Sequence, residues 1–193
     1  MKHFFAFLAL AGFALLLGCS AVDRTVRQAS LPCGINRWPV KTLTDPDAKR
    51  IRWHPINATF RHLVELPRPA KIVEDHRTAV EFRVYRIRAI LVGVRTTTDQ
   101  DLHLLLRDPV DPAIRMIAEV PDPECAKGSG HEADFAAVRK LAASIHTEGG
   151  EPLVEITGVG FFDILDHGID QHAPNGFELH PVLSIREISA EGR

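Results

Sequence analysis

The sequence contains 193 residues, of which 45% are hydrophobic and 7% aromatic, and its formal net charge is −2 at pH 7 with His neutral. This length suits one globular domain after removal of any targeting segment. A net acidic chain lacks the excess positive charge with which general nucleic-acid binders neutralise phosphates, so the composition argues against nucleic acid as a partner.

The N-terminus carries the pattern of a secretory signal. Lys2 and His3 precede an apolar run, Phe4 to Leu17, that is shorter than the roughly 20 residues a membrane-spanning helix needs. The run ends in Leu-Leu-Gly-Cys19, which resembles the bacterial lipobox, where cleavage leaves the Cys at the new N-terminus for acylation. Residues 1–18 are therefore predicted to be a lipoprotein signal peptide and Cys19 the residue that carries palmitate. An ordinary signal peptide with a chance Cys, or an uncleaved anchor, is the alternative.

Acylation of Cys19 implies a cellular location. Several acyl chains, at about 0.8 kcal/mol per buried methylene, attach a protein stably to a membrane without a transmembrane helix. Ser20, rather than Asp, follows the Cys, which resembles an outer-membrane signal. The predicted location is the bacterial cell envelope, lipid-anchored in the outer membrane and facing the periplasm, with the polar residues 19–32 as a flexible tether. Loss of Lys2 with the signal leaves 22 basic and 25 acidic side chains, a net charge of −3.

Two cysteines, Cys33 and Cys125, remain in the mature chain. One pair in an oxidising compartment predicts a disulfide. Closing a loop of about 90 residues could restrict the unfolded chain by as much as roughly 4 to 5 kcal/mol. Two buried free thiols or half of a metal site are the alternatives, although neither Cys has a CxxC partner. Residues 33–193 are interpreted as a single domain.

Alternating apolar residues predict three strands in the first half of this domain. A short helix is expected from about Thr44, where an N-cap candidate precedes a Pro. The first strand extends from Val80 to Leu91, and its apolar phase slips near Tyr85, which predicts a β-bulge in one long, bent strand. Residues 102–107 and 116–120 alternate in the same way and are the second and third strands.

The second half contains one helix and two strands. Residues 132–147 have helical periodicity, with one face formed by Phe135, Val138, Leu141, Ala142 and Ile145. Strands four and five follow over 153–163 and 177–186; Pro181 indicates an edge or a bulge, and Gly158 and Gly160 indicate curvature or close backbone approach. Three strands, a helix and two strands is the element order of the OB-fold, a five-stranded Greek-key barrel. The predicted fold is mainly β and OB-fold-like, with an irregular N-terminal segment.

Five segments together resemble a family of uncharacterised bacterial exported proteins. They are RWPVKT, HLLLRDP, MIAEVPDPEC, TGVGFFD and APNGFELHPVLSI, and they extend over nearly the whole chain after Cys33. The resemblance supports a single domain and implies no activity, cofactor or catalytic residue.

The segment between strands four and five is rich in groups that could bind a metal or another ligand. The candidates are Asp163, Asp166, His167, Asp170, His172, Glu178 and His180. Carboxylates and imidazoles on a loop that borders ligands in OB-folds can converge on Zn²⁺, Mn²⁺ or Ca²⁺. A solvated loop in which Asp and Gly set turns is the alternative. His180 and Glu178 could also meet His103 in a polar patch, unless His180 is a satisfied structural histidine.

Two further sets of charged residues were considered. Arginines near Tyr85 on the long strand and its neighbours could hold nucleic acid or an anionic saccharide, although interleaved Glu81 favours a solvated strand face; they are Arg83, Arg86, Arg88, Arg95, Arg107 and Arg115. The carboxylates Asp99, Asp101 and Asp108 are interpreted as turn residues.

No Gly-rich phosphate loop, GxSxG elbow, HExxH or CxxC pair occurs in the sequence. The preferred interpretation is a lipid-anchored cell-envelope protein with an OB-fold-like binding or structural domain. Its contact surface would surround the loop between strands four and five, and its partner would be an envelope protein or a saccharide. The alternative is a metal-dependent hydrolase of the phosphodiesterase or nuclease-like kind that uses the Asp and His residues of 163–172.

Overall fold

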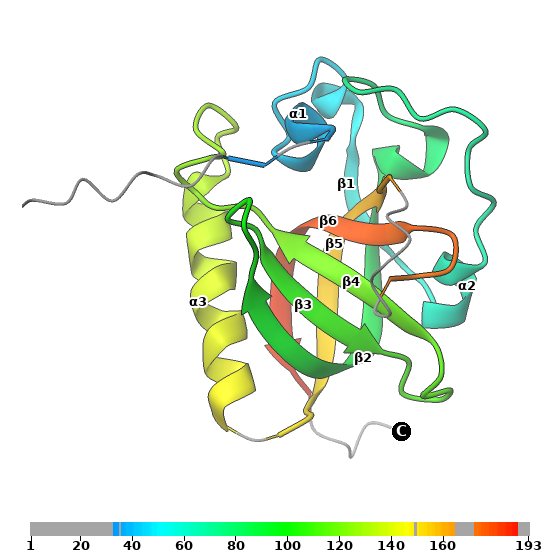
Figure 1. The fold of residues 1–193 in the computed structure, drawn as a ribbon, viewed down its shortest axis with the longest axis vertical. Helices are drawn as coiled ribbons and strands as arrows, with labels where there is room; N and C mark the ends of the chain where they lie inside the picture. Colours follow the sequence, from blue (N-terminus) through cyan, green and yellow to red (C-terminus); the bar gives the residue numbers. More distant parts are fainter. Residues whose placement is uncertain (1–32, 35, 149, 165–171, 189–193) are drawn as a thin grey trace, which may run out of the picture. The chain divides into compact units, whose positions relative to one another are not determined.

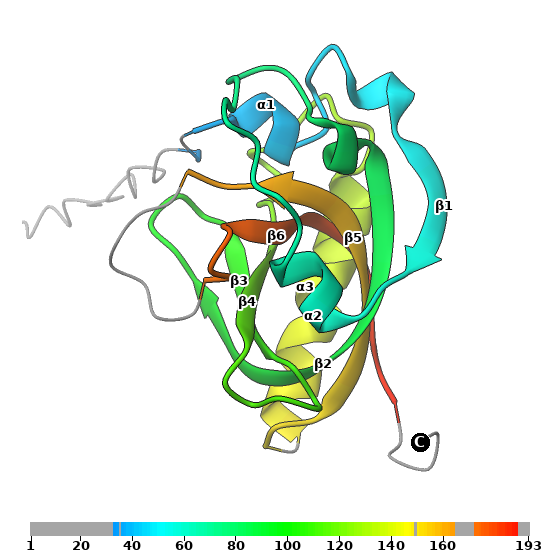
Figure 2. The ribbon, with the colours of Figure 1, turned by 90° about the vertical axis from the view of Figure 1, so that its right-hand side faces the viewer.

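Five strands close into the barrel that the element order predicts (Figures 1 and 2). The computed structural model describes residues 33–34, 36–148, 150–164 and 172–188. The strands are β2 (Arg83–Thr96), β3 (Leu102–Arg107), β4 (Arg115–Val120), β5 (Leu153–Phe162) and β6 (Phe177–Glu187). Each neighbouring pair is antiparallel except β4 and β6, which are parallel, and β5 pairs with β2 to close the barrel. The OB-fold-like architecture is confirmed.

A sixth strand, β1 (Arg52–Asn57), lies parallel to the start of β2 and extends the sheet beyond the barrel. The sequence pattern did not predict it. Nearly all of its side chains are exposed, so it has no apolar alternation to detect.

The register irregularities fall at positions that differ in part from the prediction. From Val84 to Ile90, β2 pairs with β5 residue by residue, and the extra residue in β2 lies between Leu91 and Gly93, opposite β3. Near Tyr85 the extra residues belong to β1. The apparent phase slip arises because the preceding apolar residues form a 3₁₀ turn, η2 (Ala79–Phe82), and not a strand. The bulge predicted around Pro181 is present, since β6 has extra residues there relative to β5.

One long helix, α3 (Glu132–Glu148), packs beside the barrel (Figure 1). It begins and ends within a residue of the prediction. Phe135, Val138, Ala142 and Ile145 are buried in the core as expected. Leu141 is the exception, because 44% of it is exposed.

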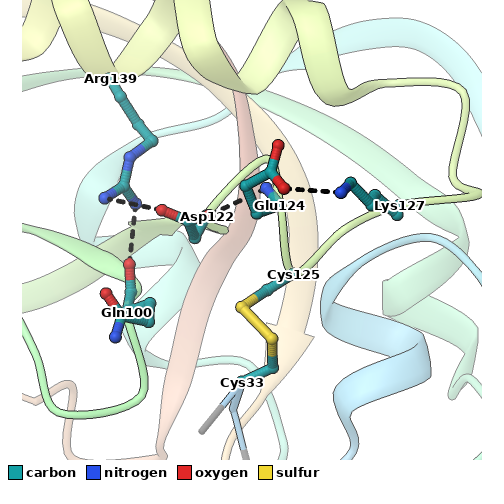
Figure 3. The surroundings of a disulfide bond; sticks show 7 residues. All are labelled: Cys33, Gln100, Asp122, Glu124, Cys125, Lys127 and Arg139. Atoms are coloured by element: carbon teal, nitrogen blue, oxygen red, sulfur yellow. Dashed lines mark hydrogen bonds and ion pairs between the residues drawn. A yellow bond between two sulfur atoms is a disulfide. The ribbon is translucent and has the colours of Figure 1, made fainter. Parts of the chain in front are cut away.

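Arg139 connects this helix to the ends of two strands. Its Nη1 donates to the carbonyl oxygens of Gln100 and Val120, each at 2.9 Å, and its Nη2 lies 3.7 Å from the carboxylate of Asp122 (Figure 3). The turn that precedes β3 is thereby held against the C-terminal end of β4.

The segment before the barrel contains α1 (Trp38–Lys41), the 3₁₀ turn η1 (Ala48–Arg50) and α2 (Phe60–Val64). The short helix expected from Thr44 is therefore only a 3₁₀ turn that starts after Asp47. The Thr59 side chain accepts a hydrogen bond from the backbone N–H of His62 and caps α2.

The predicted disulfide between Cys33 and Cys125 is confirmed (Figure 3). It joins residues 92 positions apart and connects the start of the described chain to the turn between β4 and α3.

Within the described ranges, no helix has the length and apolar character that crossing a membrane requires. Cys19 and the predicted signal peptide lie outside the described residues.

Candidate functional site

Polar side chains gather on the outer face of three barrel strands. In β3, β4 and β6, the residues at alternate positions point into the barrel, where Leu104, Ala118 and Leu179 are fully buried in the core. The residues between them face outward. We use the name His–carboxylate cluster for the outward residues and their neighbours, which are Asp101, His103, Glu119, His172, Glu178 and His180.

Glu119 lies at the centre of the His–carboxylate cluster. Its Oε1 is 2.8 Å from Nε2 of His103, and its Oε2 is 3.1 Å from Nδ1 of His180. On the other side of the imidazole, Nε2 of His180 is 3.6 Å from Oδ2 of Asp101. Glu178 completes the arrangement, because its carboxylate oxygens lie 4.0 Å from Nδ1 of His180 and 4.0 Å from Nδ1 of His172.

These groups are closed off from solvent. Asp101, Glu178 and His180 are 0% exposed, and Glu119 and His103 are 3% and 8% exposed. The ring of Phe161, from β5, lies 5.4 Å from the His180 ring between centroids. Lys41 of α1 is also buried, and its ammonium lies 5.6 Å from the centroid of the same Phe161 ring.

Burial and mutual repulsion decide the charge of the carboxyl groups. Burial and the charge of Glu119 raise the pKa of Asp101 to about 8 and raise the pKa of Glu178 well above its ordinary value. Burial acts on Glu119 in the same sense, but the imidazoles of His180 and His103 outweigh it and hold its pKa well below the ordinary value. At neutral pH, Glu119 is therefore the carboxylate of this group that carries its charge.

Lys41 places a positive charge beside the His–carboxylate cluster. Burial disfavours its charged form, but Glu119, Asp163, Glu178 and Asp101 outweigh burial and raise its pKa. The ammonium therefore remains protonated beside several acidic groups.

The His–carboxylate cluster holds most of the unpaired buried polar atoms. Among the described residues, eleven buried side-chain nitrogen and oxygen atoms have no hydrogen-bond partner within that part of the chain, and nine of them belong to these six residues. They include both carboxylate oxygens of Asp101 and of Glu178, and both ring nitrogens of His180. Buried polar groups are almost always hydrogen-bonded, so such a concentration calls for a physical reason.

Two buried ion pairs elsewhere in the described residues are well satisfied. Arg37 donates from Nη1 and Nη2 to the carboxylate of Glu81 at 2.6 and 3.0 Å, and also to the carbonyl oxygens of Phe162 and His76, each at 2.8 Å. Arg77 donates from Nη2 to the carboxylate of Asp45 at 2.6 Å. The unpaired atoms are thus a local property of the His–carboxylate cluster.

The sequence prediction located this site in part. His172, Glu178 and His180 come together, and His103 joins them through Glu119. Asp163 acts on the cluster through its charge, while its carbonyl oxygen accepts a hydrogen bond from Arg68 at 2.7 Å. Asp166, His167 and Asp170 lie outside the described residues.

Three members were missed or misassigned. Asp101 closes the turn before β3, where its carbonyl oxygen accepts from the backbone N–H and the hydroxyl of Thr97, but its side chain is fully buried in the site, which was not predicted. Asp99 and Asp108 do accept local hydrogen bonds, from Thr97 and from the backbone N–H of Val110. Glu119 and Lys41 were not candidates. A charged residue inside an otherwise apolar strand, as Glu119 is in MIAEV, was the available signal.

A groove lies on another part of the barrel wall, between the end of β1, the middle of β2, α2 and the turn after β3. Its volume is about 630 Å³. Its lining consists of residues 57–61, 86–88, 108–111 and Glu155. Two ion pairs lie in it: Arg61 is 2.8 Å from Asp111, and Arg86 is 3.8 Å from Glu155.

The predicted arginine set does not form one continuous surface. Arg86 and Arg88 line the groove, whereas Arg83 lines a separate hollow of about 500 Å³ with Arg50 and Arg52. Arg107 lies 2.6 Å from Glu151. Arg95 is opposite His103 in the β2–β3 pairing, and Arg115 is opposite Arg107.

Comparison with known proteins gives no family. Neither a protein family nor a curated protein matches this sequence. Among solved structures, asparaginyl-tRNA synthetase from Entamoeba histolytica is similar over 70% of this chain, with 12% identity and a TM-score of 0.38. Aspartyl-tRNA synthetase from the same organism is similar over 55%, with 23% identity and a TM-score of 0.35. The chain spans 24% and 18% of the lengths of those two proteins.

Proposed function

We propose that this chain is a lipid-anchored protein of the bacterial cell envelope and that its OB-fold-like barrel is a binding module for another envelope protein. The lipobox-like segment that ends at Cys19 supports the anchor. The Cys33–Cys125 disulfide supports an oxidising compartment, because such bonds persist outside the reducing cytosol. The net acidic charge supports a partner other than nucleic acid.

The observation that carries the binding role is the groove of about 630 Å³ on the barrel wall. Its volume lies in the range of ordinary ligand sites. Three basic and three acidic side chains line it, so it presents a nearly neutral surface with apolar side chains. Val110 at its rim is 89% exposed, which suits contact with an apolar side chain of a partner protein better than contact with a polyanion.

A crosslinking experiment tests this role. A photoreactive amino acid in place of Val110 should capture one envelope protein, and the purified partner should bind the wild-type chain directly. The matched control places the same amino acid at Lys127, which is exposed on the turn between β4 and α3, at the other end of the barrel from the turn after β3 (Figures 1 and 2). Equal capture from both positions, or binding of a purified envelope saccharide in the groove instead, would contradict the proposal.

The anchor has a separate test. Cells that express the whole chain should incorporate labelled palmitate into it, and a Cys19→Ala variant should lose the label and leave the membrane fraction. Labelling of that variant would exclude Cys19 as the acylated residue.

A metal-dependent hydrolase is a second candidate function, and the His–carboxylate cluster is the observation that favours it. Against it stands the burial of Asp101, Glu178 and His180, since a substrate must reach the ion on which it reacts. Hydrolysis of a phosphodiester substrate in the presence of Zn²⁺ or Mn²⁺, with loss of activity in a His180→Gln variant, would favour this candidate over a binding module.

A further inference from the structure

We propose that Asp101, Glu119 and His180 bind one divalent transition-metal ion on the outer face of β4 and β6. The site is separate from the groove on the barrel wall, and it goes beyond the binding role proposed above. The turn before β3, β4 and β6 each supply one ligand, so the ion would join three parts of the barrel.

The geometry of the three side chains is suited to one ion. Each offers one ligand atom, and these atoms lie within 4.8 Å of one another. Ligands about 2.1 Å from a tetrahedral ion are roughly 3.4 Å apart. The separation of 3.6 Å between Nε2 of His180 and Oδ2 of Asp101 is close to this value. The ligand atom of Glu119 meets the wider limit of 4.8 Å to the other two.

The unpaired atoms are the second, independent observation. Both carboxylate oxygens of Asp101 and Nε2 of His180 are buried and have no hydrogen-bond partner among the described residues, whereas Nδ1 of His180 and Oε2 of Glu119 lie 3.1 Å from each other. Two other buried ion pairs, Arg37–Glu81 and Arg77–Asp45, are well satisfied. A cation coordinated by these atoms would satisfy acceptors that the chain leaves without donors.

Neighbouring residues are placed to support such an ion. His103 lies 2.8 Å from Oε1 of Glu119 and can orient that carboxylate, as residues that contact metal ligands commonly do. Glu178 lies 4.0 Å from Nδ1 of His180 and places a further carboxylate beside this ligand.

The donor set indicates the class of ion. It combines imidazole nitrogen with carboxylate oxygen, and the two cysteines in the described residues are joined to each other. Ca²⁺ and Mg²⁺ prefer sites made only of oxygen, whereas Zn²⁺ and Mn²⁺ accept this mixture. We expect the ion to be Zn²⁺ or a similar transition metal.

Metal titration of the whole chain, expressed without a polyhistidine tag and freed of metal by a chelator, tests the inference. We expect one Zn²⁺ per chain by calorimetry and elemental analysis, a rise in the thermal midpoint, and a visible absorption band with Co²⁺ that reports nitrogen and oxygen ligands. His180→Gln or Glu119→Gln should abolish stoichiometric binding. His103→Gln should weaken Zn²⁺ binding by about 10- to 100-fold without changing the stoichiometry.

The matched control is His131→Gln. His131 also lies near a carboxylate, at 3.2 Å from Asp134, but this pair is exposed. Its replacement should leave binding unchanged. Absence of Zn²⁺ binding by the wild-type chain would overturn the inference, and so would equal binding by a chain that carries Asp101→Asn, Glu119→Gln and His180→Gln together. If a variant does not fold, the wild-type titration and its Co²⁺ spectrum still decide the question.

Discussion

The Nε2 atom of His180 and the Oδ2 atom of Asp101 lie 3.6 Å apart in the protein interior, and neither has a hydrogen-bond partner among the described residues. Both side chains are 0% exposed. An unpaired buried carboxyl group destabilises a fold, because it loses its contacts with water and gains none. A protein that keeps such a group has a use for it that outweighs the loss of stability.

This relationship predicts that Asp101→Asn has opposite effects with and without metal. In the presence of a chelator and at a pH above the raised pKa of Asp101, about 8, the variant should be more stable than the wild type by roughly 1 to 3 kcal/mol, because the wild-type carboxylate is then charged, buried and unpaired, whereas an amide carries no charge. In excess Zn²⁺ the order should reverse, since only the wild type gains the stabilisation that ligand binding provides. Urea unfolding of both proteins under both conditions measures the four free energies. A variant that is less stable under both conditions would identify Asp101 as an ordinary structural residue.

The buried pair of Arg37 and Glu81 predicts a large loss of stability when one partner is removed. Arg37 is 1% exposed, and Arg37→Met would leave the carboxylate of Glu81 without its cation, at a cost of about 3 to 5 kcal/mol. The comparison is Arg61→Met, which breaks exposed, solvent-screened ion pairs with Glu65 and Asp111 and should cost far less. Chemical unfolding of the two variants should therefore separate them clearly. Similar losses of stability in both variants would show that burial does not make the Arg37–Glu81 pair more costly to break.

The same pair predicts a contribution to acid unfolding. Burial would raise the pKa of Glu81, but the hydrogen bonds and charge of Arg37, with the backbone N–H groups of Thr78 and Phe162, outweigh burial and lower it below 4.5. A carboxyl whose pKa is lowered by folding stabilises the folded state above its unfolded pKa, and this stabilisation is lost as the pH falls through the folded pKa. Wild-type stability should thus decline below about pH 4.5. A Glu81→Gln variant should be less stable at pH 7 and should show a shallower decline; an identical pH profile would contradict the assignment.

How far the sequence predicted this molecule depends on whether a feature is local. The barrel strands and α3 have apolar periodicities, and Cys33 and Cys125 were the cysteines left to pair, so these features could be predicted. β1 could not, because its side chains are mostly exposed and it forms only through pairing with β2. Tertiary pairing, rather than propensity, decides such a strand.

The candidate site shows the same limit. His172, Glu178 and His180 were found because they stand close together in the sequence. Asp101 and Glu119 come from distant segments, and only the pairing of β4 with both β3 and β6 brings them to His180. Lys41 reaches the site from α1, a short helix that lies far from the barrel strands in the sequence, and no residue pattern links the two.

Two glycines of β5 give the last prediction, because the close backbone approach expected at them is present. A Cβ atom on Gly160 would lie 2.7 Å from Cε2 of Tyr85 and 2.9 Å from the carbonyl oxygen of Val80, and one on Gly158 would lie 2.9 Å from Cβ of Leu179. Gly160→Ala should therefore force the barrel wall apart and cost roughly 1 to 3 kcal/mol. Gly93→Ala is the matched control within another strand, where the nearest atom is the mobile Cδ1 of Leu105 at 3.2 Å, and its cost should be smaller. Thermal unfolding of the two variants tests this order, and a more stable Gly160→Ala protein would mean that the contact between β5 and Tyr85 is looser than the structure indicates.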